Sequence, residues 1–350
     1  MEFNAEDLVR ANIKKLVPYS SARDEFHGDA KIFIDANENS LGSPLTRWYN
    51  RYPDPHQLEI KTKISQIKGV SAQNIFIGNG SDEVIDILFR AFCEPGIDNV
   101  IICPPTYGMY EVSANINNVP IKKVKLSPDF QLDLPSLEEA IDPHTKIIWL
   151  CSPNNPTANS LYREDIEMIL NNFPGIVVID EAYINFSRQR SFVQELQDYP
   201  NLVVMQTLSK AWGLAALRIG MAFAGDYIIR VMNKIKPPYN ISQAAQELAG
   251  KALDEVEQVN EMIRLIVEQR KILAEKLSAI PSVLHIYPSD ANFLLVKVTA
   301  PSEIYQYLVD NGIVVRDRSK VELCEGCLRI TVGSPRENET LVKVLAAFEK

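Results

Sequence analysis

The sequence predicts an α/β protein: a large domain with a mostly parallel sheet sandwiched by helices, plus a smaller α+β domain. Two observations predict the sheet. Between residues 75 and 224, short runs of β-branched and other apolar residues recur without polar alternation, which is typical of strands buried on both faces. Segments with apolar residues at helical spacing separate many of these runs, as the helical crossovers between parallel strands require.

The expected elements follow in order along the chain. Before the sheet, the patterns predict a short amphipathic helix at 7–16, a short strand at 32–35, a rigid turn at 51–55 and a helix at 58–67. The expected strands of the large domain are 75–77, 100–103, 119–126, 147–151, 176–179, 202–205 and 219–224. The helices expected among them are 84–92, 107–114 and 162–172.

A break in the chain at Pro237 and Pro238 marks the start of a second unit. After it the patterns predict a long helical region at 242–280, and the segments 291–298, 302–311, 314–315 and 328–332 are expected to form an α+β unit of about 100 residues. The chain length favours two domains. We therefore expect an N-terminal arm (1–30) that packs with the small domain or a partner subunit, a large domain (31–240) and a small C-terminal domain (241–350).

Composition and charge exclude several classes of protein. The net charge of −9 argues against a surface for nucleic acid or anionic membranes. The five cysteines are too few and too scattered for a disulfide framework. Neither a signal peptide nor an apolar run long enough to span a membrane is visible, so a cytoplasmic location is expected. Cys324 and Cys327 have the spacing of half a zinc site, but no second pair exists, and we expect no metal.

Polar clusters follow several predicted strands, where open α/β sheets bind their ligands. Gly80, Ser81 and Asp82 open a helix, so their backbone N–H groups and the helix dipole could bind a phosphate. An ordinary capped glycine turn is the alternative. The cluster is not a dinucleotide fingerprint, because Glu83 stands where the third glycine belongs, and no Gly-Lys-Ser of a P-loop follows.

A candidate nucleophile, Lys210, follows the predicted strand at 202–205 in a turn with Thr207 and Ser209. Partial desolvation there would lower the pKa of its amine and make it nucleophilic. Arg218, eight residues later, could serve the same pocket as an anion ligand. Taken alone, a Ser-Lys pair is usually a solvated surface turn.

Three further candidates could bind a planar ring. Asp180 ends an apolar strand, where a carboxylate is costly without a partner such as a protonated pyridine nitrogen, and Tyr183 could bond to the same ring. Tyr107 could stack on the ring, although aromatics at such junctions are often part of the core or of a lid. An Asn of the segment 152–157 could donate to a ring oxygen, and an Asn-Pro turn without a ligand is the alternative. An imine-forming lysine, an aspartate and a phosphate site together are what pyridoxal 5′-phosphate needs.

At this point a family resemblance is visible over nearly the whole chain. Gly-Asn-Gly-Ser-Asp-Glu (78–83), Ser-Pro-Asn-Asn-Pro-Thr (152–157), Asp-Glu-Ala-Tyr (180–183) and Thr-Leu-Ser-Lys (207–210) resemble the class II aminotransferases, pyridoxal-phosphate enzymes of fold type I. The segments 18–25, 36–39, 51–54, 313–317 and 328–333 resemble those of histidinol-phosphate aminotransferases. The sequence departs from the usual pattern at Ala158 and Asn159, where glycine is common after Asn-Pro-Thr, and at Ser40, where proline is common.

The resemblance implies a role for each candidate. Lys210 would hold the cofactor as an imine and move the proton, and Asp180 would pair with the pyridine nitrogen. The other residues implied in cofactor binding are Asn155 and Tyr183 at the ring oxygen, Tyr107 on the ring face, Gly80, Ser81, Asp82, Thr207, Ser209 and Arg218 at the phosphate, and Tyr52 at the phosphate of the neighbouring subunit. The residues implied in substrate binding are Arg316, Arg329, Tyr19 and Asn37.

The resemblance also implies a reaction and partners. The expected reaction is a ping-pong transamination in histidine biosynthesis, from L-histidinol phosphate and 2-oxoglutarate to imidazole acetol phosphate and L-glutamate, in a homodimer that binds neither nucleic acid nor membrane. An aromatic-amino-acid aminotransferase or a threonine-phosphate decarboxylase of the same fold is the nearest alternative. A non-catalytic, cofactor-binding regulatory module is an alternative of another class.

Overall fold

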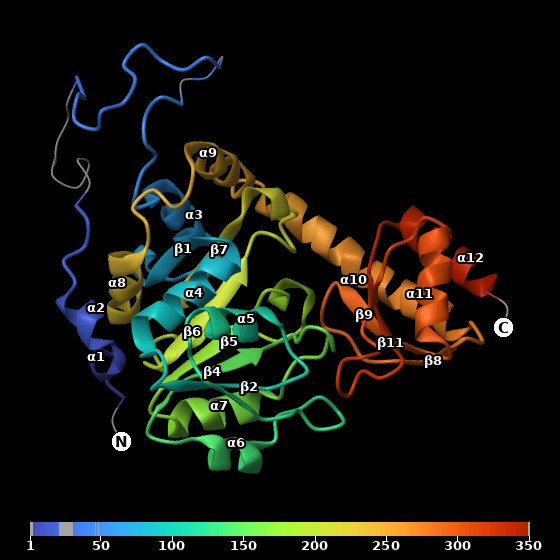
Figure 1. Ribbon diagram of the computed structural model, residues 1–350. Coiled ribbons are helices and arrows are strands. Elements are labelled where there is room, and N and C mark those ends of the chain that lie inside the picture. Colours follow the sequence, from blue (N-terminus) through green and yellow to red (C-terminus); the bar gives the residue numbers. More distant parts are fainter. Residues whose placement is uncertain (1–2, 21–30, 46, 48, 349–350) are drawn as a thin grey trace.

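A seven-stranded sheet forms the centre of the large domain in the structure, a computed structural model that describes residues 3–20, 31–45, 47 and 49–348 (Figure 1). The strand order is β1-β7-β6-β5-β4-β2-β3. Strands β2 to β6 run parallel to one another, and only β7 runs antiparallel to its neighbours β6 and β1. The strands are β1 (Ile75–Asn79), β2 (Asn99–Ile102), β3 (Ile121–Lys123), β4 (Thr145–Cys151), β5 (Ile176–Asp180), β6 (Leu202–Thr207) and β7 (Ile219–Ala224). The predicted α/β class with a mostly parallel sheet is confirmed.

Both faces of this sheet are buried, which explains the unbroken apolar runs. Trp149 and Val178 pack into the core on one face, whereas Ile148 and Ile179 pack into the core on the other. Helices α4 (Gly80–Phe92), α5 (Met109–Ile116) and α8 (Asp226–Ile235) supply apolar side chains to the first core, and α3 (Leu58–Lys68), α6 (Leu134–Ala140) and α7 (Arg163–Asn172) supply them to the second. The described residues of the large domain also form short 3-10 turns: η1 (Ala72–Asn74), η2 (Ile184–Phe186), η3 (Phe192–Glu195) and η4 (Ala215–Leu217).

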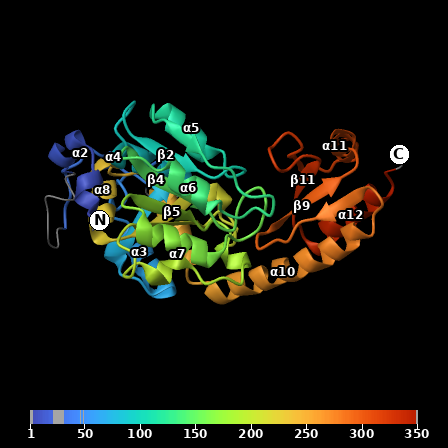
Figure 2. The same cartoon turned by 90° about the horizontal axis from the view of Figure 1, so that it is seen from below.

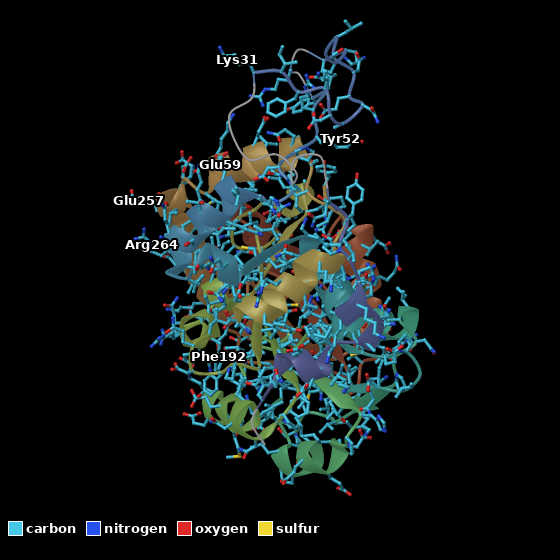
Figure 3. All side chains as sticks on the ribbon, turned by 90° about the vertical axis from the view of Figure 1, so that its left-hand side faces the viewer. Lys31, Tyr52, Glu59, Phe192, Glu257 and Arg264 are labelled. Carbon is cyan, nitrogen blue, oxygen red and sulfur yellow. The ribbon has the colours of Figure 1, made fainter. Side chains whose placement is uncertain are left out.

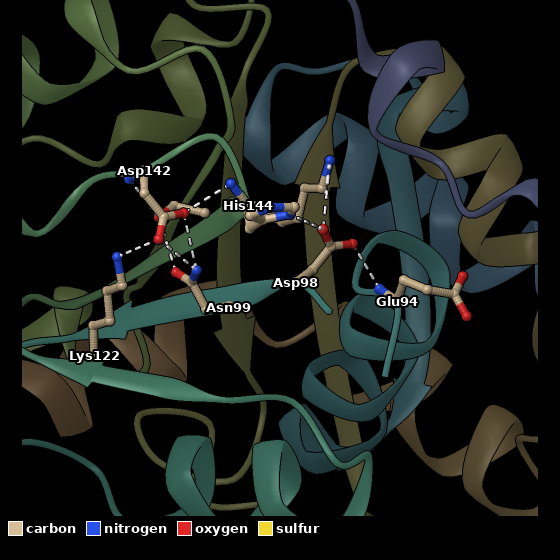
Figure 4. Close-up of polar contacts among 8 residues, drawn as sticks. Glu94, Asp98, Asn99, Lys122, Asp142 and His144 are labelled. Atoms are coloured by element: carbon tan, nitrogen blue, oxygen red, sulfur yellow. Dashed lines mark hydrogen bonds and ion pairs between the residues drawn. The ribbon is translucent and has the colours of Figure 1, made fainter. Parts of the chain in front are cut away.

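A polar network joins the amino ends of β2, β3 and β4, at the edge of the sheet opposite the ligand-binding edge (Figure 4). The Asp142 carboxylate accepts hydrogen bonds from Asn99 Nδ2 at 3.0 Å and from Lys122 Nζ at 2.6 Å. The hydrogen bonds from Lys122 and Asn99 lower the pKa of Asp142 below its ordinary range. Because every charge in this network has a partner, we conclude that the network fixes the register of the strands and is not a binding site.

The C-terminal part of the chain forms a smaller antiparallel sheet with the strand order β10-β11-β9-β8. Figure 2 shows helix α10 running from the large domain to this sheet. Leu273 of α10, Val296 and Leu328 share one core on the helix-covered face. The elements are α9 (Gln243–Ala252), α10 (Val256–Ser278), β8 (Val283–Ile286), β9 (Phe293–Val298), α11 (Pro301–Asp310), β10 (Arg316–Asp317), β11 (Cys327–Thr331) and α12 (Pro335–Ala346).

Four expectations about secondary structure were wrong in detail. Residues 32–34 form no strand, and Ile34 is 88% exposed, because no described strand lies beside them to pair with. The helix expected at 7–16 is two helices, α1 (Ala5–Leu8) and α2 (Ala11–Lys15), because Arg10 turns its backbone N–H to Ala91 O at 3.1 Å. The region 242–280 is interrupted between α9 and α10. The segment 314–315 of the expected α+β unit forms no element, and strand β10 begins directly after it, at Arg316. Helices α6, α8 and α12 and strand β8 were not predicted.

The described part of the N-terminal arm lies against the large domain. Helix α1 packs on α8, and Arg10 forms an ion pair with Glu94 at 3.2 Å. The segment that follows residue 30 projects from the body of the molecule (Figure 1). Residues 21–25 of the family-like segment 18–25 lie outside the described residues. Among the helices that the structure describes, none is long and apolar enough to cross a membrane.

Candidate active site

A cavity of about 530 Å³ lies at the carboxyl edge of the large sheet and is bounded on one side by the small sheet. Most of the predicted site residues line it. These are Ser81, Asp82, Tyr107, Asn155, Asp180, Tyr183, Thr207, Ser209, Lys210, Arg218, Arg316 and Arg329. Gly80 lies directly before Ser81 and contacts Arg218 through its backbone.

The topology of the sheet brings these residues together. The parallel strands β4, β5 and β6 end at the same edge, so Asn155, Asp180 and Lys210 meet there although the sequence separates them. Strand β7 runs in the opposite direction, so its first residues lie at this edge too. Arg218, which directly precedes β7, therefore faces the same cavity.

Two glycines allow the start of α4 to lie directly on β7. Gly80 has a left-handed backbone (φ 75°), and its N–H donates to Arg218 O at 2.8 Å. A Cβ atom on Gly80 would lie 2.5 Å from Arg218 Nη2. A Cβ atom on Gly220 would lie 2.3 Å from the backbone nitrogen of Ser81. The first N–H groups of α4 and the Arg218 guanidinium thus form one cradle in which no larger residue fits.

We expect Gly220→Ala to destabilise the protein by about 1–3 kcal/mol, because the added methyl group meets backbone atoms that cannot rotate away. Urea unfolding followed by circular dichroism measures this change. Gly225→Ala is the matched control, because its Cβ atom would lie 4.0 Å from the nearest neighbour, Pro200 O. Equal unfolding midpoints for the two variants would contradict the close contact between α4 and β7.

Asp180 is a buried carboxylate, 3% exposed, at the end of β5. Burial raises its pKa, while hydrogen bonds from Tyr110 Oη at 2.6 Å and from the backbone N–H of Ala182 at 3.0 Å act in the opposite direction. The Tyr110 ring is itself fixed by stacking on Trp149, with ring centroids 5.1 Å apart. Asp180 is therefore held in one position and would be stabilised by a cation in the cavity.

Lys210 lies in a turn after β6, and its side chain is accessible from the cavity. Desolvation by the surrounding protein and repulsion from Arg329 lower its pKa below the ordinary value. The turn is closed by hydrogen bonds from Gly213 N to Lys210 O at 3.1 Å and from Ser209 N to Thr207 Oγ1 at 3.1 Å. Lys210 Nζ lies 5.6 Å from the centroid of the Tyr183 ring. A primary amine with a lowered pKa in a preformed turn is suited to nucleophilic attack.

The walls of the cavity also carry hydrogen-bonding groups. Asn155 Oδ1 accepts a hydrogen bond from Arg329 Nη1 at 2.5 Å, which leaves its amide nitrogen able to donate to a ligand. Tyr107 Oη donates to Asp82 Oδ1 at 3.3 Å. The other Asp82 oxygen lies 3.2 Å from Arg218 Nη2, so Asp82 orients both of these cavity residues.

Arg316 and Arg329 come from the small sheet, where they are directly opposite one another on the antiparallel strands β10 and β11. Leu328 and Ile330 point into the small-domain core, so Arg329 between them points to the opposite face, toward the cavity. Asp317 pairs with Leu328 in the ladder and accepts a hydrogen bond from Ser319 N at 2.7 Å. Among the described residues, Asp317 forms no ion pair with Arg316 or Arg329.

Three predicted site residues lie outside this cavity in the single chain. Tyr52 stacks on Tyr239 with ring centroids 4.4 Å apart, and both line a separate hollow together with Asn37. Tyr19 is 73% exposed. Figure 3 shows Lys31 on the projecting segment and Tyr52 nearer to the body of the molecule.

The cavity also contains residues that the sequence analysis did not single out. Arg318 lines the cavity, and Tyr110 bonds to Asp180 from behind it. The Arg-x-Arg spacing of residues 316 and 318 was a usable signal for Arg318, because alternate residues of an extended chain share a face. Tyr110 carried no comparable signal, since only the folded sheet brings it to Asp180. The other lining residues that were missed are Thr106, Gly108, Met109, Val112, Cys151, Pro156, Ala182 and Val321.

Comparisons with known proteins agree with this architecture. Residues 30–345 match the model of the family described as aminotransferase class I and II. The histidinol-phosphate aminotransferase of Cytophaga hutchinsonii is 54% identical, over 99% of this chain and 100% of that protein. Among solved structures, the fold is similar to the histidinol-phosphate aminotransferase from Clostridium acetobutylicum (TM-score 0.79, 22% identity, 85% of this chain and 90% of that one).

A second similar structure is the histidinol-phosphate aminotransferase from Sinorhizobium meliloti in complex with pyridoxal-5′-phosphate (TM-score 0.78, 23% identity, 89% of each chain). At these identities the solved structures support the fold alone, whereas the family match spans most of the sequence. The relative from Cytophaga hutchinsonii aligns with nearly every residue. The chain therefore belongs to the class I and II aminotransferase family and, within it, to the histidinol-phosphate aminotransferases.

Proposed function

We propose that the chain transfers the amino group of L-histidinol phosphate to 2-oxoglutarate in histidine biosynthesis, and that it uses pyridoxal 5′-phosphate to do so. The observation that carries the proposal is the meeting of Lys210, Asp180 and the arginines of the small sheet in one cavity. The 54% identity with the relative from Cytophaga hutchinsonii supports the choice of substrate. The products would be imidazole acetol phosphate and L-glutamate.

The residues present fit the cofactor. The cradle of Gly80, Ser81 and Asp82, with Thr207, Ser209 and Arg218, would bind its phosphate. Asp180 would bind the protonated pyridine nitrogen and Tyr107 would stack on the ring. Asn155 and Tyr183 would bond to the ring oxygen, and burial raises the pKa of Tyr183, so its hydroxyl stays protonated and can donate.

When bound, pyridoxal phosphate supplies an aldehyde that condenses with amines and a ring that accepts electrons from the substrate carbon. Desolvation lowers the pKa of Lys210, which favours the free amine, and Lys210 Nζ would hold the proton removed from the amine-bearing carbon of the substrate. Asp180, held in place by Tyr110 and Ala182, would keep a proton on the ring nitrogen. The guanidinium groups of Arg316 and Arg329 orient the anionic end of either substrate.

The proposal includes a homodimer in which the two subunits share their active sites. Tyr52, Tyr19 and Asn37 would act at the cavity of the partner subunit, since none of them lines the cavity of its own chain. Exposed apolar residues of the N-terminal region supply a surface that a second copy could cover. These residues are Val17, Ile32, Ile34, Leu41 and Leu45.

A heterodimer tests whether Tyr52 acts on the partner. One subunit carries Lys210→Ala and the other Tyr52→Ala, and two different affinity tags isolate the mixed species. If Tyr52 acts on the partner, the site with the intact Lys210 also receives the intact Tyr52 of the other subunit. That site should then bind the cofactor as tightly as the wild type does. Action within a subunit predicts that the remaining Lys210 site binds cofactor about 10–100-fold more weakly, through the loss of a hydrogen bond to a charged group. A heterodimer of Lys210→Ala with wild type is the control.

Turnover with 2-oxoglutarate tests the proposed substrate. Histidinol phosphate should react with a higher kcat/KM than phenylalanine, and glutamate should form in equal amount to imidazole acetol phosphate. Release of carbon dioxide from threonine phosphate would instead identify a decarboxylase. A colourless protein that does not bind added pyridoxal phosphate would contradict the cofactor and with it every catalytic role above.

Two broader expectations belong to the same proposal. The chain would work in the cytoplasm, as part of amino-acid biosynthesis, on small molecules and without nucleic acid or membrane. The division into an arm (1–30), a large domain (31–240) and a small domain (241–350) would place the cavity between the two domains. The core on the helix-covered face of the small sheet, which is built from C-terminal residues such as Leu273, Val296 and Leu328, supports this division.

A further inference from the structure

Arg318 is a third arginine at the substrate end of the cavity. It follows Arg316 by two residues, just beyond the end of β10, and both residues line the cavity. Its backbone N–H donates to Cys327 O at 2.9 Å, which extends the pairing of β10 with β11 beyond Asp317. The segment that carries Arg318 is therefore held in place by the sheet.

The three arginines bring positive charge together, and the attraction of Asp317 offsets their repulsion at Arg318 only in part. Desolvation lowers the pKa of Arg329 and of Arg318, and repulsion from Arg316 contributes to both shifts. Across the part of the chain that the structure describes, no carboxylate forms an ion pair with any of the three. Arg318 Nη1 donates to a backbone carbonyl, Asp317 O, at 3.3 Å.

This arrangement costs stability unless an anion enters the cavity, because like charges on paired strands repel one another. Arg329 already contacts Asn155, close to the proposed ring site. Arg316 of β10 and Arg318, just beyond its end, line the same cavity. Three guanidinium groups provide more donors than one carboxylate can accept in bidentate geometry, whereas a phosphate has three free oxygens.

We propose that Arg318 is a specificity-determining residue that binds the phosphate of the substrate and selects a dianionic phosphate over a monoanionic carboxylate. The inference rests on the proposed function, since it assigns a ligand to the same cavity. Electrostatic attraction grows with the charge of the ligand, so a third arginine favours the dianion more than the monoanion. A phosphate monoester takes its second charge near pH 6.

The test is Arg318→Gln in the holoenzyme, measured with histidinol phosphate and with phenylalanine as amino donors. We expect kcat/KM for histidinol phosphate to fall about 10–100-fold, mostly through KM, because a charged hydrogen bond is lost. The value for phenylalanine should change less than about 3-fold, since its carboxylate carries one charge. Arg318→Lys should recover part of the loss.

Lys320→Gln is the matched control, because it removes a positive charge from the same segment while Lys320 is exposed and does not line the cavity. A pH series adds a readout that a structural role would not change. The KM of the wild type should fall as pH rises through about 6, where the dianion forms, and this fall should be smaller in Arg318→Gln. An equal loss with both donors, or a loss in Lys320→Gln of the same size, would overturn the inference.

Inorganic phosphate separates this inference from the proposed function. If the wild type does not turn over histidinol phosphate, the proposed substrate is wrong, yet the role of Arg318 as a phosphate ligand can still be measured. Calorimetric titration of the holoenzyme with inorganic phosphate should then give about 10-fold weaker binding in Arg318→Gln than in the wild type. Equal phosphate affinities would overturn the inference whatever the substrate is.

Discussion

Lys210→Ala should abolish transamination, with kcat reduced by about 10⁴-fold or more, because the variant loses both the nucleophile and the group that carries the proton. Pyridoxal phosphate should still bind, because Asp180 and the cradle at Gly80 remain. It should be removed by gel filtration, since no covalent bond to the chain exists. Steady-state assays and the absorbance spectrum after gel filtration measure the two effects.

The pKa of Lys210 adds a second expected result for the wild-type protein. Desolvation and the neighbouring Arg329 lower this pKa, so the amine becomes free at a lower pH than an exposed lysine does. The rate of covalent attachment of pyridoxal phosphate to the cofactor-free protein should therefore rise with pH and level off below the ordinary lysine pKa of 10.5. An increase that continues unchanged past this value would contradict the desolvated site.

Lys68→Met is the control for Lys210→Ala. Burial lowers the pKa of Lys68 as well, but this residue does not line the cavity. The control should keep its covalent cofactor and most of its activity. If Lys210→Ala retained the cofactor covalently, or if Lys68→Met lost it, Lys210 would not be the attachment site.

Much of the large domain could be predicted because its strands are apolar on both faces. The strands at 147–151 and 176–179 were predicted to within two residues of β4 and β5 at each end. The same criterion failed at 32–35, where Ile32 and Ile34 are apolar but exposed. An apolar run shows that a segment needs burial, and it does not show which neighbour supplies it.

Helices α8 and α12 were missed although local signals were present. Helix α12 begins with a capping box, in which Ser334 and Glu337 exchange side-chain and backbone hydrogen bonds. Helix α8 buries Ile228, Ile229 and Met232 at helical spacing. Strand β8 is different, because its residues are exposed or half-buried and it pairs only at the edge of the small sheet. Such a strand is specified by tertiary pairing rather than by its own composition.

The wall of the cavity formed by the large sheet was more predictable than the wall formed by the small sheet. Asp180 and Lys210 each end or follow a buried strand, and parallel strands necessarily bring those ends to one edge of the sheet. The position of Arg316 and Arg329 depends on the packing of the small sheet against the large domain, which no local pattern encodes. The contact of Tyr110 with Asp180 likewise joins residues that are seventy positions apart.

Asp180→Asn should reduce kcat by about 10²–10³-fold or more, because the fixed negative charge that keeps the ring nitrogen protonated is lost. Asparagine has the same shape and can still accept from Ala182 N and donate to Tyr110 Oη, so the fold should be preserved. Cofactor affinity, measured by fluorescence titration of the cofactor-free protein, should fall as well. Glu181→Gln is the matched control, since burial also raises the pKa of Glu181 but this residue bonds to Ser191 and Gln206 away from the cavity.

The same substitution should stabilise the cofactor-free protein at neutral pH, by about 1–3 kcal/mol, because an unpaired buried carboxylate is costly. Burial raises the folded-state pKa of Asp180, so the folded state holds this proton to a higher pH than the unfolded state does. The contribution of Asp180 to stability therefore falls as pH rises from its ordinary value of 3.8 through the raised value, and the full cost persists above that. The amide of the asparagine in the variant cannot titrate, so urea midpoints of the two cofactor-free proteins should converge at low pH and separate as pH rises.

A variant less stable than the wild type at pH 7 would contradict this account, because Asp180 would then already be satisfied without the cofactor. Gain of stability with loss of catalysis in one variant would identify Asp180 as a charge that the fold maintains for its ligand.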